Sequence, residues 1–321
     1  MNEKVGDMLK MRRMFKWFIC FSLVYSLNES YMTQIVSGAK PIVGGPQLAV
    51  LVNGKKVVFH GGDPISENDR VLVPLRGIGE ELGAKVEFKE NTILYEKEDR
   101  KIKFELGSKI ASINSAMVTM ESQARAIKGR IYVPLRFISE YLGENVLWDP
   151  IGNWVWVGDR VIPRLEDVVK KEPLEPYKKY FQNFDVLLKD VEGTEYSDAR
   201  VITYLQLPLK INDTLTIYDI WPIKQEDVEG IQIRASFNGF TTYLLSENSQ
   251  PRQRQERKGL LIKNQDGTTT SSYPIVNGND MFNDPNYKNY KLQDVEYIYL
   301  REPVDSIVMI KCPFVYKEII S

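Results

Sequence analysis

Short segments in which apolar and polar residues alternate predict strands along most of this chain. The clearest lies in the second half, where Ile231 and Ile233 alternate with Gln232 and Arg234, as expected for a half-buried strand. Six further segments of the second half read as strands: 200–207, 214–220, 241–245, 260–263, 295–300 and 307–311. Strands at this spacing without intervening helices predict a β-rich, sandwich- or barrel-like domain over residues 185–321.

Helical spacing is found in a short segment of the first half. Leu75, Ile78 and Leu82 recur at i, i+3 and i+7 and form one apolar stripe. Pro74 fits the first turn of a helix because it has no N–H to lose, and Gly83 is the expected terminator. The pattern predicts a strand that leads directly into a short helix.

The same phrase occurs twice, at a constant offset of 60 residues, with the form V-P-L-R-x-I-x-E-x-L-G at 73–83 and at 133–143. The shared positions include Pro74, Arg76, Glu80, Gly83, Pro134, Arg136, Glu140 and Gly143. This internal duplication predicts a two-repeat domain over residues 48–160, each repeat an antiparallel sheet with a short helix. The fold class is therefore α+β.

Arg76 and Glu80, like Arg136 and Glu140, are four residues apart and share a helix face. They could contact ligands at two equivalent sites, or form ion pairs and caps that serve the fold. We favour the structural interpretation, because both copies keep the pair as a fold requirement would.

The N-terminus is typical of an export signal. Basic residues precede the apolar run 17–27, whose 11 residues suit a signal peptide and are short for a membrane span. Residues 1–38 are thus expected to be a signal peptide or an N-terminal membrane anchor, and 39–47 a tether. Cleavage would remove Cys20 and leave Cys312 alone, so no intramolecular disulfide could form.

A charged segment interrupted by Pro173 and Pro176 predicts a linker over residues 161–184. The net charge of the chain is −1, with 42 basic and 43 acidic residues. Such a balance supplies no basic field for nucleic acid, so this class of partner is not expected.

The doubled phrase resembles the copper amine oxidase-like N-terminal domain, also called the stalk domain, over about residues 48–159. The resemblance also rests on the Asn53-Gly54 hairpin signal and on Val86-x-Phe88 and Val146-x-Trp148 after each phrase. It implies a non-catalytic domain in which a small antiparallel sheet wraps a helix. It also implies a secreted or wall-associated bacterial protein.

Amine oxidase chemistry is not expected. The oxidases bind copper through three histidines, whereas this chain has one, His60. Their quinone cofactor forms from a tyrosine in an Asn-Tyr-Asp/Glu context, and here Tyr287 and Tyr290 are each followed by lysine. We predict a non-enzyme without a cofactor.

Trp148, Trp154 and Trp156 are the candidate binding residues. Their rings could stack on the sugars of a wall polymer or glycan, or they could form a small aromatic core, which we favour.

Two loops carry concentrated charge. Asp280 and Asp284 lie in an oxygen-rich segment that could bind Ca²⁺, although an ordinary turn-rich loop is the preferred interpretation. Arg252, Arg254 and Arg257 with Lys258 predict a basic loop that could touch anionic wall polymers, or is simply solvated.

The functional hypothesis is a non-catalytic secreted or cell-envelope protein, whose stalk domain presents a β-rich domain to a wall polymer, glycan or protein. Membrane contact is expected only through the N-terminal segment. Two alternatives stay open: a secreted hydrolase with carboxylate chemistry in the C-terminal domain, and a purely structural spacer.

Overall fold

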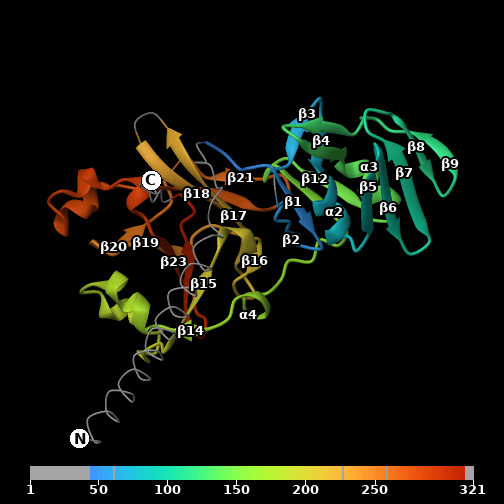
Figure 1. The fold of residues 1–321 in the computed structure, drawn as a ribbon. Helices are drawn as coiled ribbons and strands as arrows, with labels where there is room; N and C mark the ends of the chain where they lie inside the picture. The colour runs from blue at the N-terminus through green and yellow to red at the C-terminus, as the bar shows by residue number, and fades with distance from the viewer. Residues whose placement is uncertain (1–43, 61, 226–227, 258, 315–321) are drawn as a thin grey trace, which may run out of the picture. The chain divides into compact units, whose positions relative to one another are not determined.

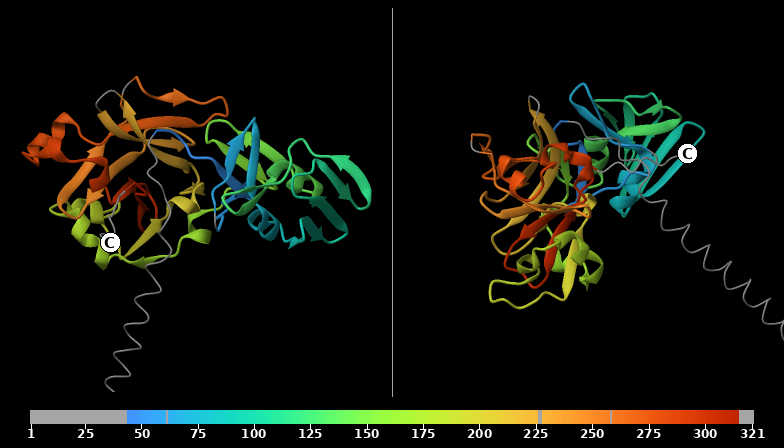
Figure 2. Two further views of the ribbon diagram at one scale, coloured as in Figure 1. Left: turned by 45° about the horizontal axis from the view of Figure 1, so that its top comes forward. Right: turned by 90° about the vertical axis from the view of Figure 1, so that its left-hand side faces the viewer.

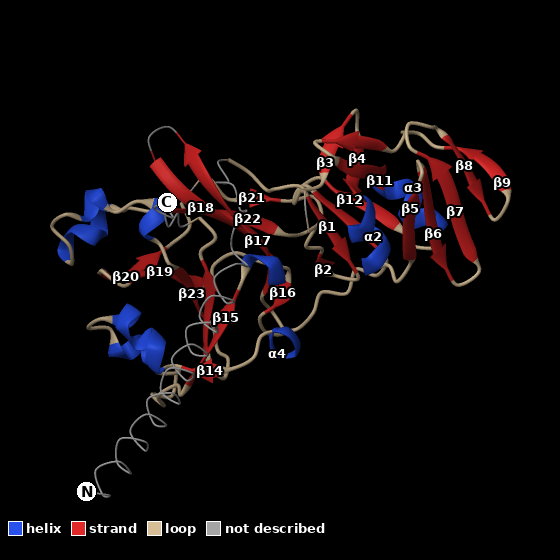
Figure 3. Ribbon diagram, in the orientation of Figure 1, coloured by secondary structure: helices blue, strands red, loops and turns tan. Residues whose placement is uncertain are grey.

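The computed structural model describes residues 44–60, 62–225, 228–257 and 259–314, and these residues form an α+β, β-rich fold with five sheets (Figures 1 and 3). The expected signal peptide or anchor at 1–38, and the tether up to residue 43, lie outside them. Among the described residues, none of the helices has the length and apolarity needed to cross a bilayer.

The two copies of the repeated phrase meet each other in one sheet. Its strand order is β10 (Arg125–Ile127), β11 (Arg130–Pro134), β4 (Arg70–Pro74) and β3 (Ile65–Glu67). β4 and β11 are antiparallel, with Val73 opposite its own equivalent Val133. The two repeats are therefore related by a local two-fold axis through this pair.

Each central strand leads into one short helix, as the sequence predicts. α2 (Leu75–Glu81) follows Pro74 and α3 (Leu135–Tyr141) follows Pro134. Gly83 and Gly143 come just after the helices with positive φ of 73° and 99°, a conformation that glycine adopts without strain.

The hairpins form two further sheets, one beside each repeat. The first has the order β5 (Lys85–Lys89), β6 (Thr92–Lys97), β7 (Arg100–Glu105), β8 (Ile110–Ile113) and β9 (Ala116–Thr119). The second has the order β12 (Val146–Asp149), β13 (Trp154–Val157), β1 (Ala49–Val52) and β2 (Lys55–Lys56). β1 and β13 are parallel, a departure from the antiparallel expectation. β6 and β8 also run parallel to each other, because each is antiparallel to β7 between them. The strands β12, β13, β1 and β2 thus correspond in order and direction to β5, β6, β8 and β9, and the second sheet has no counterpart of β7.

A glycine in α2 shows how tightly the first repeat is packed. A Cβ on Gly79 would lie 2.6 Å from Cε1 of Tyr95 and closer still to Val86. Tyr95 cannot yield, because it is fully buried and its hydroxyl donates a 2.5 Å hydrogen bond to the carbonyl of Leu75.

We therefore expect Gly79→Ala to lower the free energy of unfolding by about 1–3 kcal/mol, measured by urea denaturation. The matched control is Ser139→Ala at the equivalent position of α3. Ser139 is buried without a hydrogen-bond partner among the described residues, so its removal should be neutral or slightly stabilising. Equal losses at the two positions would contradict this account.

The two repeats share one hydrophobic core, and the sheets of the second half share another, larger one; we call these parts of the structure the first and the second domain. One sheet of the second domain has the order β14 (Glu172–Pro173), β15 (Asp198–Ile202), β24 (Ile307–Lys311), β23 (Tyr297–Arg301), β19 (Thr241–Ser246) and β20 (Ser249–Arg254). The other has the order β16 (Leu209–Lys210), β17 (Thr216–Gln225), β18 (Val228–Ala235), β22 (Thr269–Pro274) and β21 (Ile262–Lys263). Ile217 and Ile233 from one sheet and Leu244, Ile298 and Ile310 from the other belong to one buried cluster.

The segment 161–184 is not a free linker, which corrects the sequence prediction. It contains α4 (Leu165–Val168), β14 and the 3₁₀ helix η1 (Glu175–Phe181). Leu165 belongs to the main core, while Phe181 belongs to a second core that includes residues of the 3₁₀ helix η2 (Asp185–Leu188). Apolar residues spaced between the charges and prolines thus integrate this segment into the second domain. The remaining 3₁₀ helices are η3 (Tyr204–Gln206), η4 (Gly278–Phe282), η5 (Tyr287–Asn289) and η6 (Leu292–Asp294).

Candidate functional site

The charged pairs of the two repeats lie on exposed helix faces. Arg76 and Glu80 are both exposed, and so are Arg136 and Glu140. In the second pair, Nε of Arg136 lies 3.8 Å from Oε1 of Glu140, with both side chains about half exposed. A solvated pair of this kind contributes little to stability.

Two of the three candidate tryptophans are buried, so they offer no surface for stacking on a sugar. Trp154 is 0% exposed and Trp156 is 2% exposed. They pack with Leu51 of the first domain and with Ile162 and Tyr218, which follow it in the chain. Stacking on a ligand is thereby excluded for these two rings in this structure.

Trp148 is 45% exposed, almost the same as the 44% of its repeat equivalent Phe88. Of the three candidate tryptophans, it is the one left at the surface.

A comparison of the two repeats shows why Trp154 and Trp156 are buried. Lys89 pairs with Thr92 across a two-residue turn, whereas Asp149 pairs with Trp154 across a four-residue loop. Trp154 thus takes the place of Thr92, and Trp156 that of Leu94. The second repeat carries large aromatic rings and a longer loop on the side where the second domain covers it.

A buried ion pair joins the two domains. Nζ of Lys56 on β2 lies 3.0 Å from Oδ1 of Asp219 on β17, and both side chains are at most 2% exposed. The ammonium also lies 3.6 Å from the ring centroid of Tyr204 and 4.9 Å from that of Trp154. Burial lowers the pKa of Lys56 and raises the pKa of Asp219, while the attraction between them opposes both shifts.

A buried arginine, Arg234, forms a second connection, between the longer loop and the second domain. Nη1 of Arg234 donates a 2.7 Å hydrogen bond to Oδ2 of Asp149, and its Nη2 donates a 2.5 Å bond to Asp266. A Cβ on Gly152 would lie 2.8 Å from the same Nη1 and 2.9 Å from Cδ2 of Trp154, so a side chain there would require these groups to shift. The aromatic, copy-specific face therefore serves to join the domains.

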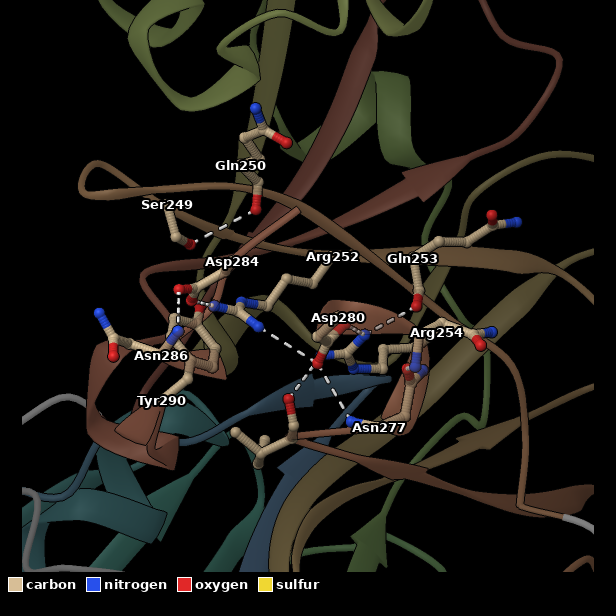
Figure 4. A network of polar contacts seen from close by, with 12 residues as sticks. Ser249, Gln250, Arg252, Gln253, Arg254, Asn277, Asp280, Asp284, Asn286 and Tyr290 are labelled. Atoms are coloured by element: carbon tan, nitrogen blue, oxygen red, sulfur yellow. Dashed lines mark hydrogen bonds and ion pairs between the residues drawn. The ribbon is translucent and has the colours of Figure 1, made fainter. Parts of the chain in front are cut away.

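The other concentration of charge lies in the second domain, where β20 faces the segment between β22 and β23 (Figure 4). Nη1 and Nη2 of Arg254 donate hydrogen bonds of 3.0 and 2.8 Å to the two carboxylate oxygens of Asp280. Arg252 lies 3.2 Å from Asp280 and 2.6 Å from Asp284. Its guanidinium also lies 4.1 Å from the ring centroid of Tyr290. Arg252, Arg254 and Asp280 are at most 7% exposed in their side chains.

This geometry corrects the interpretation of the basic segment as a solvated loop. The segment is a strand with two inward arginines, and Asp280 and Asp284, the alternative calcium ligands, are their counter-ions. The carboxylates and guanidinium groups neutralise one another, which leaves neither set as a ligand-binding site. Across the described residues, no cluster of three or more acidic, histidine or cysteine side chains could hold a metal ion.

The same contacts brace a loop, residues 277–291, which we call the tip loop. Oδ2 of Asp280 also accepts a 3.0 Å hydrogen bond from the backbone N–H of Asn277, which fixes the start of η4. Directly beside the buried Asp280, Met281 is 56% exposed and Phe282 is 79% exposed. Buried charges thus hold in place a loop that turns two large apolar side chains to solvent.

The comparison with known families can be set against this geometry. Residues 51–156 match the family model of the copper amine oxidase N-terminal domain. The match runs from β1 to β13 and covers about a third of the chain, as the sequence resemblance predicts. No curated protein is similar enough to the chain to count as a relative.

Three further groups could carry chemistry: the thiol of Cys312, the imidazole of His60 and the carboxyl group of Glu302. Burial raises the pKa of the Cys312 thiol to about 12, so the thiol stays protonated at neutral pH. His60, within the matched domain, is exposed. Burial raises the carboxyl pKa of Glu302, whose carboxylate accepts a hydrogen bond from Asn212.

Proposed function

We propose that this protein is a non-catalytic secreted or cell-surface protein. In this proposal, its copper amine oxidase N-terminal domain supports a β-rich domain, and the tip loop of that domain binds a component of the cell envelope. The export signal predicted for residues 1–38 supports the location.

One observation carries the proposal: the tip loop is braced by buried charges and exposes adjacent apolar side chains. Burying Arg254 with Asp280 contributes little net stability, because desolvation offsets the attraction of the pair. The exposed side chains of Met281 and Phe282 contribute no hydrophobic stabilisation to the fold. An arrangement that stability does not explain favours a binding role.

The support role of the first domain rests on its interface. Trp154 and Trp156 bury aromatic surface against the second domain, and the pair of Lys56 with Asp219 fixes the contact. A domain held in this way can present its neighbour in a defined orientation.

Phe282→Ala is expected to lower retention of the purified protein on an isolated cell-envelope fraction about tenfold, because it removes most of one buried aromatic side chain from the contact. Retention is measured by co-sedimentation over a range of envelope concentrations. The matched control is Val191→Ala, a residue that is 87% exposed in a different turn. Unchanged retention of the Phe282 variant would rule out the tip loop, and no retention of the wild type would favour the spacer alternative.

A further inference from the structure

We propose that the tip loop inserts into the surface of an anionic lipid bilayer. This inference rests on the proposed function and names the partner of the same loop. It departs from the expectation that the N-terminal segment makes the only membrane contact.

The exposure of the apolar residues suits insertion into a partner better than stacking of a flat ring on a sugar. Phe282 is 79% exposed, so its ring stands free of its neighbours on nearly every side. A ring that offers one face to a sugar lies against the protein with its other face and is about half covered. The backbone agrees, because the orange segment with η4 and η5 projects from the second domain in Figure 1 and in the left view of Figure 2. A projecting apolar tip suits a soft, continuous apolar phase.

The charges of the tip loop suit an anionic surface. Its two carboxylates, Asp280 and Asp284, face Arg252 and Arg254 and are neutralised by them. The lysines of the loop, Lys288 and Lys291, are exposed. The outward charge of residues 277–291 is therefore positive and belongs to the same loop as the apolar tip, as in proteins that bind the bilayer interface.

An aromatic residue completes this pattern. Tyr287 is half-buried, and the ammonium of Lys288 lies 5.9 Å from its ring centroid. Tyrosine and lysine side chains with an apolar body and a polar end are typical of the headgroup region.

The brace lowers the cost of insertion. Since Asp280 is tied to Arg254 and to the backbone of Asn277, the loop is already ordered before it meets a surface. One loop alone supplies weak, reversible binding, and stable attachment takes a second membrane signal. The basic and apolar N-terminal segment, if retained, would supply one.

The experiment uses the full chain with Cys20→Ser and an environment-sensitive NBD label at Met281→Cys, which leaves Phe282 in place. Cys312 is buried and does not label. The control carries the label at Val191→Cys, again with Cys20→Ser. Vesicles of phosphatidylcholine alone are compared with vesicles that also contain phosphatidylglycerol, each with and without brominated acyl chains.

We expect the label at position 281 to shift to the blue and to be quenched by brominated lipid in anionic vesicles, whereas the label at 191 stays in water. Without the label, Phe282→Ala should weaken partitioning into anionic vesicles about tenfold. Lys288→Gln with Lys291→Gln should weaken it about thirtyfold on anionic vesicles and hardly at all on neutral ones.

A protein that sediments with anionic vesicles while its label at 281 stays unquenched would overturn the inference, as would a protein that does not sediment with them. If Phe282→Ala still lowers retention on the envelope fraction in that case, the proposed function stands and the partner is a wall polymer or a protein. If Phe282→Ala also leaves retention on the envelope fraction unchanged, both the proposed function of the tip loop and the bilayer inference are wrong.

Discussion

Replacing Lys56 with methionine is expected to lower the free energy of unfolding by about 3–5 kcal/mol. The substitution keeps the length of the side chain but leaves the carboxylate of Asp219, which is 0% exposed, without its cation. Chemical denaturation monitored by tryptophan fluorescence measures the loss, because Trp154 and Trp156 lie in the same interface.

The matched control is the double variant Lys56→Met with Asp219→Leu, which removes both charges. It should recover most of the lost stability, since an apolar pair of similar volume often replaces a buried ion pair without loss. A double variant as unstable as the single one would show that packing, and not the unpaired charge, is responsible.

The loss should also depend on pH. Burial raises the pKa of Asp219 in the folded protein, and removing Lys56 takes away the attraction that opposes this rise. A carboxyl group whose pKa is higher in the folded than in the unfolded protein favours folding at low pH, below the unfolded pKa of about 3.9. This contribution is lost as the pH rises through the folded-state pKa. The deficit of Lys56→Met should therefore be smaller at about pH 4 than at about pH 7. A constant deficit would contradict the assignment to Asp219.

Asp280→Asn is also expected to lower the free energy of unfolding by about 3–5 kcal/mol, because it leaves Arg254, whose side chain is 0% exposed, without its carboxylate partner. The brace of the tip loop should open at the same time. Amide hydrogen exchange over residues 277–291 is expected to accelerate more than exchange in β19 or β23, which pair with each other in the sheet.

The control for this prediction is Asp284→Asn. Asp284 is 34% exposed and pairs with Arg252, which keeps Asp280 as a second partner. Asp284→Asn should therefore lower the free energy of unfolding clearly less than Asp280→Asn does. Equal losses at the two positions would argue against Asp280 as the centre of the network.

The architecture of the first domain follows from the sequence because its signals are local. Pro74 and Gly83 fix the ends of a helix within ten residues, and the duplication repeats the same information. The parallel pairing of β1 with β13 could not be read in this way, because it joins Ala49 to Trp154 across more than a hundred residues.

The partners of the charged candidate residues could not be predicted, for the same physical reason. Arg254 and Asp280 are 26 residues apart, so each looked like an unpaired charge in its own loop. One local signal was available: Arg252 and Arg254 are two residues apart and share a strand face, which indicates a common inward direction. The sequence favours an aromatic core for Trp154, but Ile162 and Tyr218, which pack against it, lie in a part of the chain whose fold is not encoded near Trp154.

The parallel neighbours β1 and β13 have a mechanical consequence. The chain enters the first domain at the start of β1 and leaves it after β13, at opposite ends of the strand pair. Tension between an N-terminal attachment and the second domain would pull the two strands lengthwise past each other. Their backbone contacts from Ala49 to Val52 would then bear the load together, instead of opening one after another like a zip.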